Sequence, residues 1–340
     1  MNKLVIKSIK KEEVTKSLKQ TITEVFLEAT DNLIWLKKGD RVLLKPALNS
    51  PTPYPATTDP TTIETIKEIL ENRGAEVFVG DQSGIEHVLH DETGVIKGDS
   101  AKNFTNAGNK IDNFIAFEKE DWNKGFIHFQ NEKTKSWPGG FYITKWINQV
   151  DHIISICRPS THAQAGVTLG FKNLVGLLRL DSRMEFHSSG PFFAPMKVMS
   201  QKTKLKYPKD KENLFFQKIV EISAAIEDKL RLTFFTGTKA QTTFGPDARL
   251  IGLFKSYVSQ PETGYVWASD NQVAAELFAI EYLTKLYKDV PTLNKLLQKF
   301  LIKSNGQIKE MGTYPPEEHP FIKFAQKLNM GDLNYKKIKL

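Results

Sequence analysis

The stretch that decides the fold runs from residue 41 to residue 81. Residues 41–46 read RVLLKP, residues 59–74 read DPTTIETIKEILENRG, and residues 76–81 read EVFVGD. The first and the last are short apolar runs, which are typical of buried strands. The middle one opens with an Asp-Pro pair suited to a helix start, carries isoleucines on one helical face and ends at Gly74. Strand, helix and strand in this order predict a βαβ unit with two parallel strands.

The same patterns predict further elements on both sides of this unit. The apolar spacing of residues 12–29 is that of an amphipathic helix, and residues 150–157 form another buried run. Asp270 stands directly before an apolar helical pattern, and we expect it to cap that helix. In the C-terminal half the patterns predict helices at residues 213–230, 271–287 and 291–302 and strands at residues 232–236 and 265–268. We place no element in the polar and aromatic segment 95–145.

These elements together predict an α/β fold, with a mixed or mostly parallel sheet, or sheets, flanked by helices. A length of 340 residues allows two domains or one large domain. We expect one α/β unit over residues 1–340. Within it we expect two lobes, residues 1–145 and 146–340, around a cleft.

The composition is that of an ordinary globular protein, with 40% apolar and 25% charged residues. No apolar stretch approaches the roughly 20 residues that span a bilayer, and the N-terminal sequence MNKLVIKSIKKEEV has too short an apolar core for a signal peptide. The single cysteine, Cys157, excludes an internal disulfide framework, a cysteine-based zinc site and an iron–sulfur cluster borne by the chain itself. We therefore expect a cytoplasmic protein without a membrane partner.

The chain is basic, with 47 Lys and Arg residues against 39 Asp and Glu residues and a formal charge of +8. The densest run, residues 202–211 (KTKLKYPKDK), contains a proline and is typical of a solvated loop. No RNA-recognition, helix-turn-helix or zinc-finger pattern accompanies it. We therefore expect no nucleic-acid partner and favour a small anionic molecule as the ligand.

Polar side chains follow the predicted strands at the points where these strands end. In an open α/β sheet, ligands bind beyond the carboxyl ends of the parallel strands. If the strands share one sheet and run parallel, their trailing residues meet at one edge. These residues are Lys45 and Asn49, Asp81 and Ser83, Arg158 and His162, and Asp270. Each one alone is more typical of a solvated turn or a helix cap, so the prediction depends on their joint placement.

The segment from residue 158 to residue 187, RPSTHAQAGVTLGFKNLVGLLRLDSRMEFH, is the densest in polar side chains of this kind. Lys172 stands there among apolar residues, and burial lowers the pKa of a lysine so that it can act as a base, as a nucleophile or as a ligand for an anion. The alternative is a lysine that reaches from a helix into solvent. The segment adds Thr168, Lys172, Asn173, Arg183 and His187 to the candidate site.

His162 and His187 are candidates for proton transfer beside Lys172, or for binding a metal ion, and the alternative for each is a structural hydrogen bond. No HExxH motif or close histidine pair supports the metal ion. We assign His87 and His90 to a surface loop. The chain also lacks a GxGxxG motif, a Walker loop and a GxSxG elbow, so dinucleotide-binding, nucleoside-triphosphate-binding and α/β-hydrolase functions lack their expected motifs.

Several of these segments resemble the bacterial and archaeal family called domain of unknown function 362 (DUF362). Residues 45–47 (KPA) are similar to its strand end Lys-Pro-Asn, residues 57–60 (TTDP) to its helix start Thr-Thr-(His/Asp)-Pro, and residues 80–81 (GD) to its Gly-Asp after the next strand. Residues 161–187 are similar to its central motif, Lys-Thr-His, then Val-Thr-Leu-x-x-Lys-Asn-x-x-Gly, then an Arg and a His.

The resemblance covers residues 41–335 and includes a late Gly-Pro at residues 245–246 and a helix region with the acidic residues Asp270 and Glu276. It has departures. Ser160 stands where the family has the lysine before Thr-His, and Ala47 stands where it has the asparagine of Lys-Pro-Asn, with Asn49 as a substitute. The Lys-Asn-x-x-Gly block is the most specific part.

The resemblance implies two further properties. Many relatives carry a ferredoxin-like cysteine cluster that this chain lacks, so an electron-transfer role would need an iron–sulfur partner protein. The family is also distantly similar to the nickel-pincer lactate racemase group, in which a His and a Lys separated by nine residues help hold a pyridinium cofactor and its nickel. His162 and Lys172 have that separation.

Three functions follow from these observations. The first is an enzyme that acts on a small carboxylate or phosphate metabolite by Lys and His acid–base chemistry, in a cleft between the lobes. The second is a racemase or isomerase that depends on a metal or nickel cofactor, with His162 and His187 as metal ligands. The third is an accessory or redox-partner protein of an iron–sulfur system, without catalysis of its own. The sequence identifies no cofactor and leaves a metal ion open.

Overall fold

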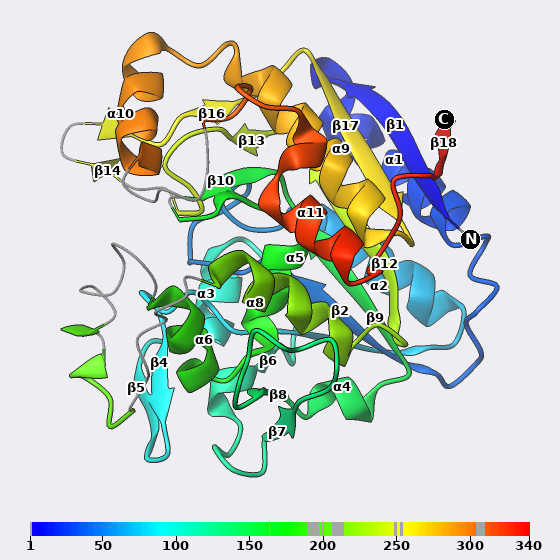
Figure 1. The fold of residues 1–340 in the computed structure, drawn as a ribbon. Helices are drawn as coiled ribbons and strands as arrows, with labels where there is room; N and C mark the ends of the chain where they lie inside the picture. The colour runs from blue at the N-terminus through cyan, green and yellow to red at the C-terminus, as the bar shows by residue number, and fades with distance from the viewer. Residues whose placement is uncertain are drawn as a thin grey trace.

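A central mixed sheet organises the molecule (Figure 1). The computed structural model describes residues 2–162, 164–188, 197–198, 200–205, 214–247, 250–251, 254–303 and 310–340. Within these residues the sheet has eight strands in the order β18-β1-β17-β12-β9-β2-β3-β6. Their bounds are β1 (Lys3–Lys10), β2 (Arg41–Pro46), β3 (Glu76–Asp81), β6 (Ile115–Ala116), β9 (His152–Cys157), β12 (Leu230–Gly237), β17 (Thr263–Ser269) and β18 (Lys336–Lys339).

Smaller sheets surround the central one. A four-stranded sheet has the order β11 (Gly166–Thr168), β10 (Ser160–His162), β13 (Ala240–Gln241), β16 (Val258–Ser259). Three hairpins are formed by β4 (Leu89–Asp91) with β5 (Gly94–Lys97), β7 (Phe126–Phe129) with β8 (Phe141–Thr144), and β14 (Leu250–Ile251) with β15 (Phe254–Lys255). The segment 95–145, in which the sequence places no element, thus contains short strands and the short helices α3 (Ser100–Asn106) and η2 (Phe117–Lys119).

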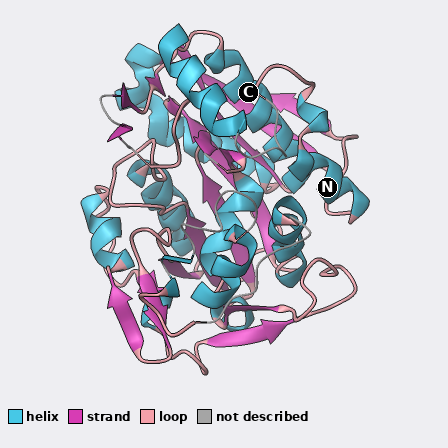
Figure 2. Ribbon diagram, turned by 60° about the vertical axis from the view of Figure 1, so that its left-hand side comes forward, coloured by secondary structure: helices cyan, strands magenta, loops and turns pink. Residues whose placement is uncertain are grey.

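The helices cover both faces of the central sheet, so the α/β prediction is confirmed (Figure 2). The α-helices are α1 (Val14–Ala29), α2 (Pro60–Asn72), α3 (Ser100–Asn106), α4 (Trp146–Gln149), α5 (Gly170–Asn173), α6 (Leu180–His187), α8 (Phe215–Glu221), α9 (Gln272–Tyr287), α10 (Thr292–Lys303) and α11 (Pro320–Lys327). The 3-10 helices are η1 (Lys11–Glu13), η2 (Phe117–Lys119), η3 (Leu174–Leu177), η5 (Ile222–Ala225) and η6 (Pro316–Glu318).

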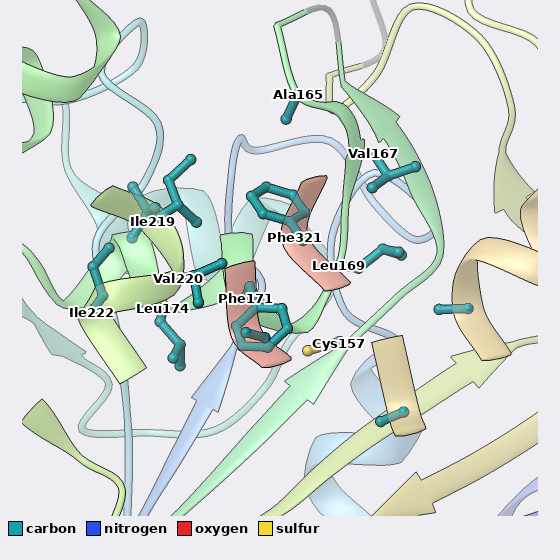
Figure 3. Packing of buried hydrophobic residues seen from close by; sticks show 14 of the residues in the cluster. Cys157, Ala165, Val167, Leu169, Phe171, Leu174, Ile219, Val220, Ile222 and Phe321 are labelled. Atoms are coloured by element: carbon teal, nitrogen blue, oxygen red, sulfur yellow. The ribbon is translucent and has the colours of Figure 1, made fainter. Parts of the chain in front are cut away.

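The alternation of side chains along β2 shows how the two cores form. Val42 and Leu44 face α1 and α2, whereas Leu43 faces the other side, where α5, α8, α9 and α11 pack. Figure 3 shows this second core, in which Phe171 of α5 and Phe321 of α11 lie near Cys157 at the end of β9. Strands buried on both faces read as continuous apolar runs, which is why the pattern of β2 and β9 identifies them.

The predicted βαβ unit is present. β2 pairs in parallel with β3, and α2 begins at Pro60 with the Asp59 carboxylate accepting a hydrogen bond from the amide of Thr62 at 3.2 Å. β9 and β12 extend the parallel arrangement on the other side of β2. The parallel ends of β2, β3 and β9 therefore meet at one edge of the sheet, as the sequence predicts.

The strand that precedes Asp270 runs in the opposite direction. β17 pairs antiparallel with both β1 and β12, so its carboxyl end lies at the edge opposite the ends of β2 and β3. Asp270 also does not cap α9, because the Asn271 side chain accepts the hydrogen bond from the amide of Ala274. The Asp270 carboxylate instead accepts a hydrogen bond from the amide of Lys3. Both expectations for Asp270 were wrong.

Two other segments differ from the prediction, or can be compared with it only in part. The helix expected at residues 213–230 is the shorter α8 followed by η5, because residue 230 already pairs with β9 as the start of β12. The basic loop expected at residues 202–211 lies partly outside the described residues, which end at 205 and resume at 214. None of the described helices has the length and apolar character to cross a membrane.

The chain halves share the central sheet. β1, β2, β3 and β6 come from residues 1–145 and the other four strands from residues 146–340, with β1 inserted between β17 and β18. A boundary at residue 145 therefore does not divide the sheet, and the two lobes stay a prediction.

Candidate functional site

A cavity of about 140 Å³ lies beyond the carboxyl ends of β2, β3 and β9, and α5 and α6 form part of its wall. The structure brings most of the predicted site residues together around it. Those that line the cavity are Lys45, Asn49, Asp81, Arg158, His162, Thr168, Lys172, Asn173, Arg183 and His187. They come from widely separated parts of the chain, and the parallel strands bring them to one place.

Two predicted site residues lie elsewhere. Ser83 is buried, and its hydroxyl accepts a hydrogen bond from Asn103 Nδ2 at 3.0 Å, so it fixes α3 and is not part of the cavity wall. Asp270 lines a different, open pocket with Asn271 and Asp332. The antiparallel direction of β17 explains this separation.

A buried ion pair joins the ends of β2 and β3. Lys45 Nζ lies 2.7 Å from Asp81 Oδ1, and both side chains are almost completely buried. Lys45 Nζ also donates to the carbonyl of Pro46 at 2.8 Å and to Asn173 Oδ1 at 3.2 Å, so its three protons have acceptors. The second oxygen of Asp81 accepts a hydrogen bond from the amide of Leu48. Burial lowers the pKa of Lys45, and Asp81 opposes that change. This pair is satisfied internally.

Three other cationic side chains around the cavity have no such partner. Within the described residues, no carboxylate forms an ion pair with Arg158, Arg183 or Lys172. Arg158 Nε donates to the carbonyl of Ala56 at 3.0 Å and Nη1 to that of Thr168 at 3.3 Å. Nε and Nη1 of Arg183 are buried and have no hydrogen-bond acceptor in the part of the chain that the structure describes. Burial lowers the pKa of each guanidinium to about 10.

Lys172 lies on α5 with 9% of its surface exposed. Burial, followed by the charges of Arg183 and Arg158, lowers its pKa to about 7. No hydrogen-bond partner of Nζ occurs among the described residues, and the ring of Phe186 lies beneath it at 5.4 Å. The lysine therefore does not reach into solvent. At neutral pH its amino group is unprotonated in a fraction of the molecules.

The two histidines of the cavity differ in which ring nitrogen carries the proton. His162 Nδ1 accepts hydrogen bonds from the amides of Gln164 and Ala165, at 3.0 and 3.1 Å, which places the proton on Nε2. His187 Nδ1 lies 2.7 Å from the carbonyl oxygen of Arg183 and must donate to it, which leaves Nε2 as a lone-pair acceptor. Burial and the charge of Lys172 hold the pKa of both rings well below the ordinary value. One neutral ring thus offers a donor and the other an acceptor.

Two residues that line the cavity, Gln82 and His87, were not predicted to do so from the sequence. Gln82 is 2% exposed and lines the cavity, and neither polar atom of its side chain has a partner among the described residues. It directly follows Asp81, so the same strand-end rule contained the signal. His87 also lines the cavity, with Nε2 at 2.5 Å from Asp247 Oδ2, and His90 is buried against Trp122. The assignment to a surface loop was wrong for His90, which is a buried residue of β4, whereas His87 lies in a partly exposed turn whose side chain faces the cavity.

A buried carboxyl group holds the start of α5. Glu276 of α9 is completely buried, and its Oε2 accepts hydrogen bonds from the amides of Gly170 at 2.6 Å and Phe171 at 3.3 Å. Burial raises its pKa to about 8. Glu276 therefore positions the helix that carries Lys172, and it is not part of the cavity wall.

The chain belongs to the DUF362 family. The family model, described as a domain of unknown function (DUF362), matches residues 42–281. No curated protein matches the chain. Among solved structures it is similar to the lactate racemase apoprotein from Thermoanaerobacterium thermosaccharolyticum, at 13% identity and a TM-score of 0.46. That match covers 83% of this chain and 57% of the racemase, so the chain spans little more than half of the racemase's length.

The geometry of the cavity explains the three named residues of the block Lys172-Asn173-x-x-Gly176. Lys172 contributes the unpartnered amine, and Asn173 donates to the carbonyl of Lys45 and accepts from its ammonium group. Gly176 lies against the ion pair, where an added Cβ would be 2.0 Å from Asp81 Oδ1 and 2.9 Å from Lys45 Nζ. The block thus holds the ion pair on one side and presents an amine on the other.

Gly176→Ala tests this close approach. We expect the free energy of unfolding to fall by about 1–3 kcal/mol, because the methyl group forces apart a buried, hydrogen-bonded pair. Urea denaturation measures it. Gly139→Ala is the matched control, since an added Cβ there meets nothing within 4 Å. Equal stability of the two variants would contradict the packing described here.

The ion pair itself is tested by a double-mutant cycle. Lys45→Met and Asp81→Asn should each lower the free energy of unfolding by about 3–5 kcal/mol, because each leaves one buried charge without its partner. The double variant should lose less than the sum of the two by at least about 1 kcal/mol. Additive losses in urea denaturation would show that the two groups do not interact.

Proposed function

We propose that this DUF362 protein is an enzyme that binds a small carboxylate or phosphate metabolite in the cavity and moves protons on it with Lys172, His162 and His187. The observation that supports it is the unbalanced charge of the wall. Arg158, Arg183 and Lys172 all line the cavity, and the acidic lining residue Asp81 is already paired with Lys45.

Buried charges without partners destabilise a folded protein unless something compensates them. A bound anion supplies part of that compensation, because the side chains of Arg158, Arg183 and Lys172 line the same cavity. An anion in the cavity thus offsets part of the positive charge of the wall.

The size of the cavity limits the ligand. Its volume of about 140 Å³ is close to the ~150 Å³ of an apolar cavity that holds benzene. Pockets that enclose cofactor-sized ligands are larger, at about 300–1,000 Å³. We therefore propose a small metabolite, of a few carbon atoms, as the ligand that this cavity suits best.

Removal of one guanidinium tests the binding step. We expect sulfate or pyruvate to raise the melting temperature of the protein and to bind Arg183→Gln about 10- to 100-fold more weakly, since a hydrogen bond to a charged group contributes about 1.5–3 kcal/mol. Calorimetric titration measures the affinities. Arg73→Gln is the control, because Arg73 is exposed and bonds to Asn32. The proposed function fails if no small carboxylate, sulfate or phosphate binds, or if Arg183→Gln binds them as the wild type does.

The affinity for sulfate should also depend on pH. Sulfate keeps its charge between pH 6 and 8, whereas Lys172, with a pKa of about 7, is charged below this value and neutral above it. Affinity should therefore fall as the pH rises through about 7, and Lys172→Met should remove that dependence. A wild-type affinity that stays constant over this range would contradict the assigned state of Lys172.

The two other functions stay predictions. Among the described residues no group of three or more His, Cys, Asp and Glu side chains is placed to hold a metal ion. His162 and His187 share their wall with Arg158 and Arg183, whose positive charges favour an anion over a bare metal cation. Metal analysis of the purified protein tests the metal- or nickel-dependent alternative, and co-purification with an iron–sulfur protein tests the accessory role.

A further inference from the structure

The cavity contains two buried lysines in opposite states. Lys45 is 1% exposed and has three acceptors, namely Asp81, Pro46 and Asn173. Lys172 is 9% exposed and has none among the described residues. The first lysine is a structural cation. The second is an amine held in place with its lone pair and protons uncommitted.

We propose that Lys172 Nζ is a nucleophile that forms an imine with the carbonyl carbon of an aldehyde or ketone that also bears a carboxylate or phosphate group. This inference rests on the function proposed above and narrows its substrate class from small anions to small anionic carbonyl compounds.

The surroundings of Lys172 favour the nucleophilic form of the amine. An amine attacks a carbonyl only when it is unprotonated, and proteins obtain this state by burying the lysine and placing another cation near it. Both conditions hold here, since Arg183 and Arg158 lie close enough to disfavour its charge. The face of the Phe186 ring, with its centroid 5.4 Å from Nζ, attracts the ammonium form and so opposes part of this effect.

The two guanidinium groups also favour a particular substrate. They line the same cavity as the amine and lack a carboxylate partner in the described chain, so we expect the anionic group of a ligand to bind near Nζ. In a 2-oxo acid the carbonyl carbon is directly bonded to the carboxylate carbon. Binding the carboxylate therefore places the reactive carbon next to the amine.

The opposite tautomers of the histidines suit the proton transfers of imine formation. The nitrogen lone pair attacks the carbonyl carbon, and the C=O π pair moves to oxygen, which receives a hydrogen bond from His162 Nε2–H, as a neutral imidazole can give. His187 Nε2 takes a proton from nitrogen and passes it to that oxygen, giving a carbinolamine. The nitrogen lone pair then forms C=N while the C–O bond breaks. His187 takes the remaining N–H proton and passes it to the departing hydroxide, which leaves as water. Amine and carbonyl thus give imine and water, with no net proton and no redox partner.

Reductive trapping tests the imine. The protein is incubated at pH 7.5 with pyruvate, glyoxylate or dihydroxyacetone phosphate and with cyanoborohydride, whose hydride adds to the imine carbon. For pyruvate we expect one adduct per chain, heavier than the protein by pyruvic acid less one oxygen atom, and peptide mapping should place it on Lys172. Lys45 is the internal control, because its protons are committed to three acceptors and it should stay unmodified. Propanoate, which has the anion but no carbonyl group, should give no adduct.

Lys172→Met should abolish the specific adduct. Methionine keeps an unbranched side chain of similar length against Phe186 but has no amine. As a second measurement on the wild type, methylation with ¹³C-formaldehyde and cyanoborohydride gives an NMR signal for each lysine. The signal of Lys172 should titrate near pH 7.

The outcomes separate this inference from the function on which it rests. If the small anions bind with Arg183-dependent affinity but none of the three carbonyl compounds labels Lys172 above the surface lysines, the imine is wrong and the anion site stands. Equal labelling of Lys172→Met, or titration of Lys172 with the exposed lysines, would also overturn it. If no small anion binds, the proposed function itself fails.

Discussion

The buried ion pair between Lys45 and Asp81 is the constraint on which the arrangement of the site depends. It joins the ends of two adjacent parallel strands, and each of its groups is further bonded to the backbone that leaves those strands. Breaking it leaves a charge in the protein interior, so the loops after β2 and β3 have little freedom to move apart. Asn173 and Gly176 fit against the same pair and attach α5 and η3 to it. The position of Lys172 is a consequence of that attachment.

The pair also divides the charges of the cavity into two classes. Lys45 and Asp81 neutralise one another, whereas Arg158, Arg183 and Lys172 face the cavity without an acidic partner in the described residues. A protein interior that keeps such cations has to stabilise them by other means, and Arg158 does so in part through two backbone carbonyl groups. The guanidinium of Arg183, which lines the cavity without a carboxylate partner in the described residues, is the clearest support for an anionic ligand. Binding and proton transfer are then properties of adjacent groups on one wall.

Much of this site could be predicted from the sequence because its basis is local. Apolar runs identify β2, β3 and β9, the Asp-Pro start identifies α2, and the rule that parallel strands end at one edge brings Lys45, Asp81 and Arg158 together. Strand direction is not local, which is why Asp270 was misplaced: residues 265–268 read as a strand, but only pairing with β1 and β12 makes β17 antiparallel. The sequence also could not predict the tautomers of His162 and His187 or whether Lys172 has a hydrogen-bond partner. These depend on which amides and carbonyl groups lie near each side chain.

The place of β1 in the sheet has a consequence for how the chain acquires its structure. β1 is the first of the eight strands to leave the ribosome, yet its two neighbours, β17 and β18, are the last two. Its hydrogen-bonding edges stay without strand partners while more than two hundred residues are synthesised, from residue 11 to residue 262. During that time α1 can cover only one of its faces. Unpaired strand edges favour association with other chains. Slow translation of the C-terminal third is thus expected to promote aggregation, and chaperones that shield nascent strands are expected to prevent it.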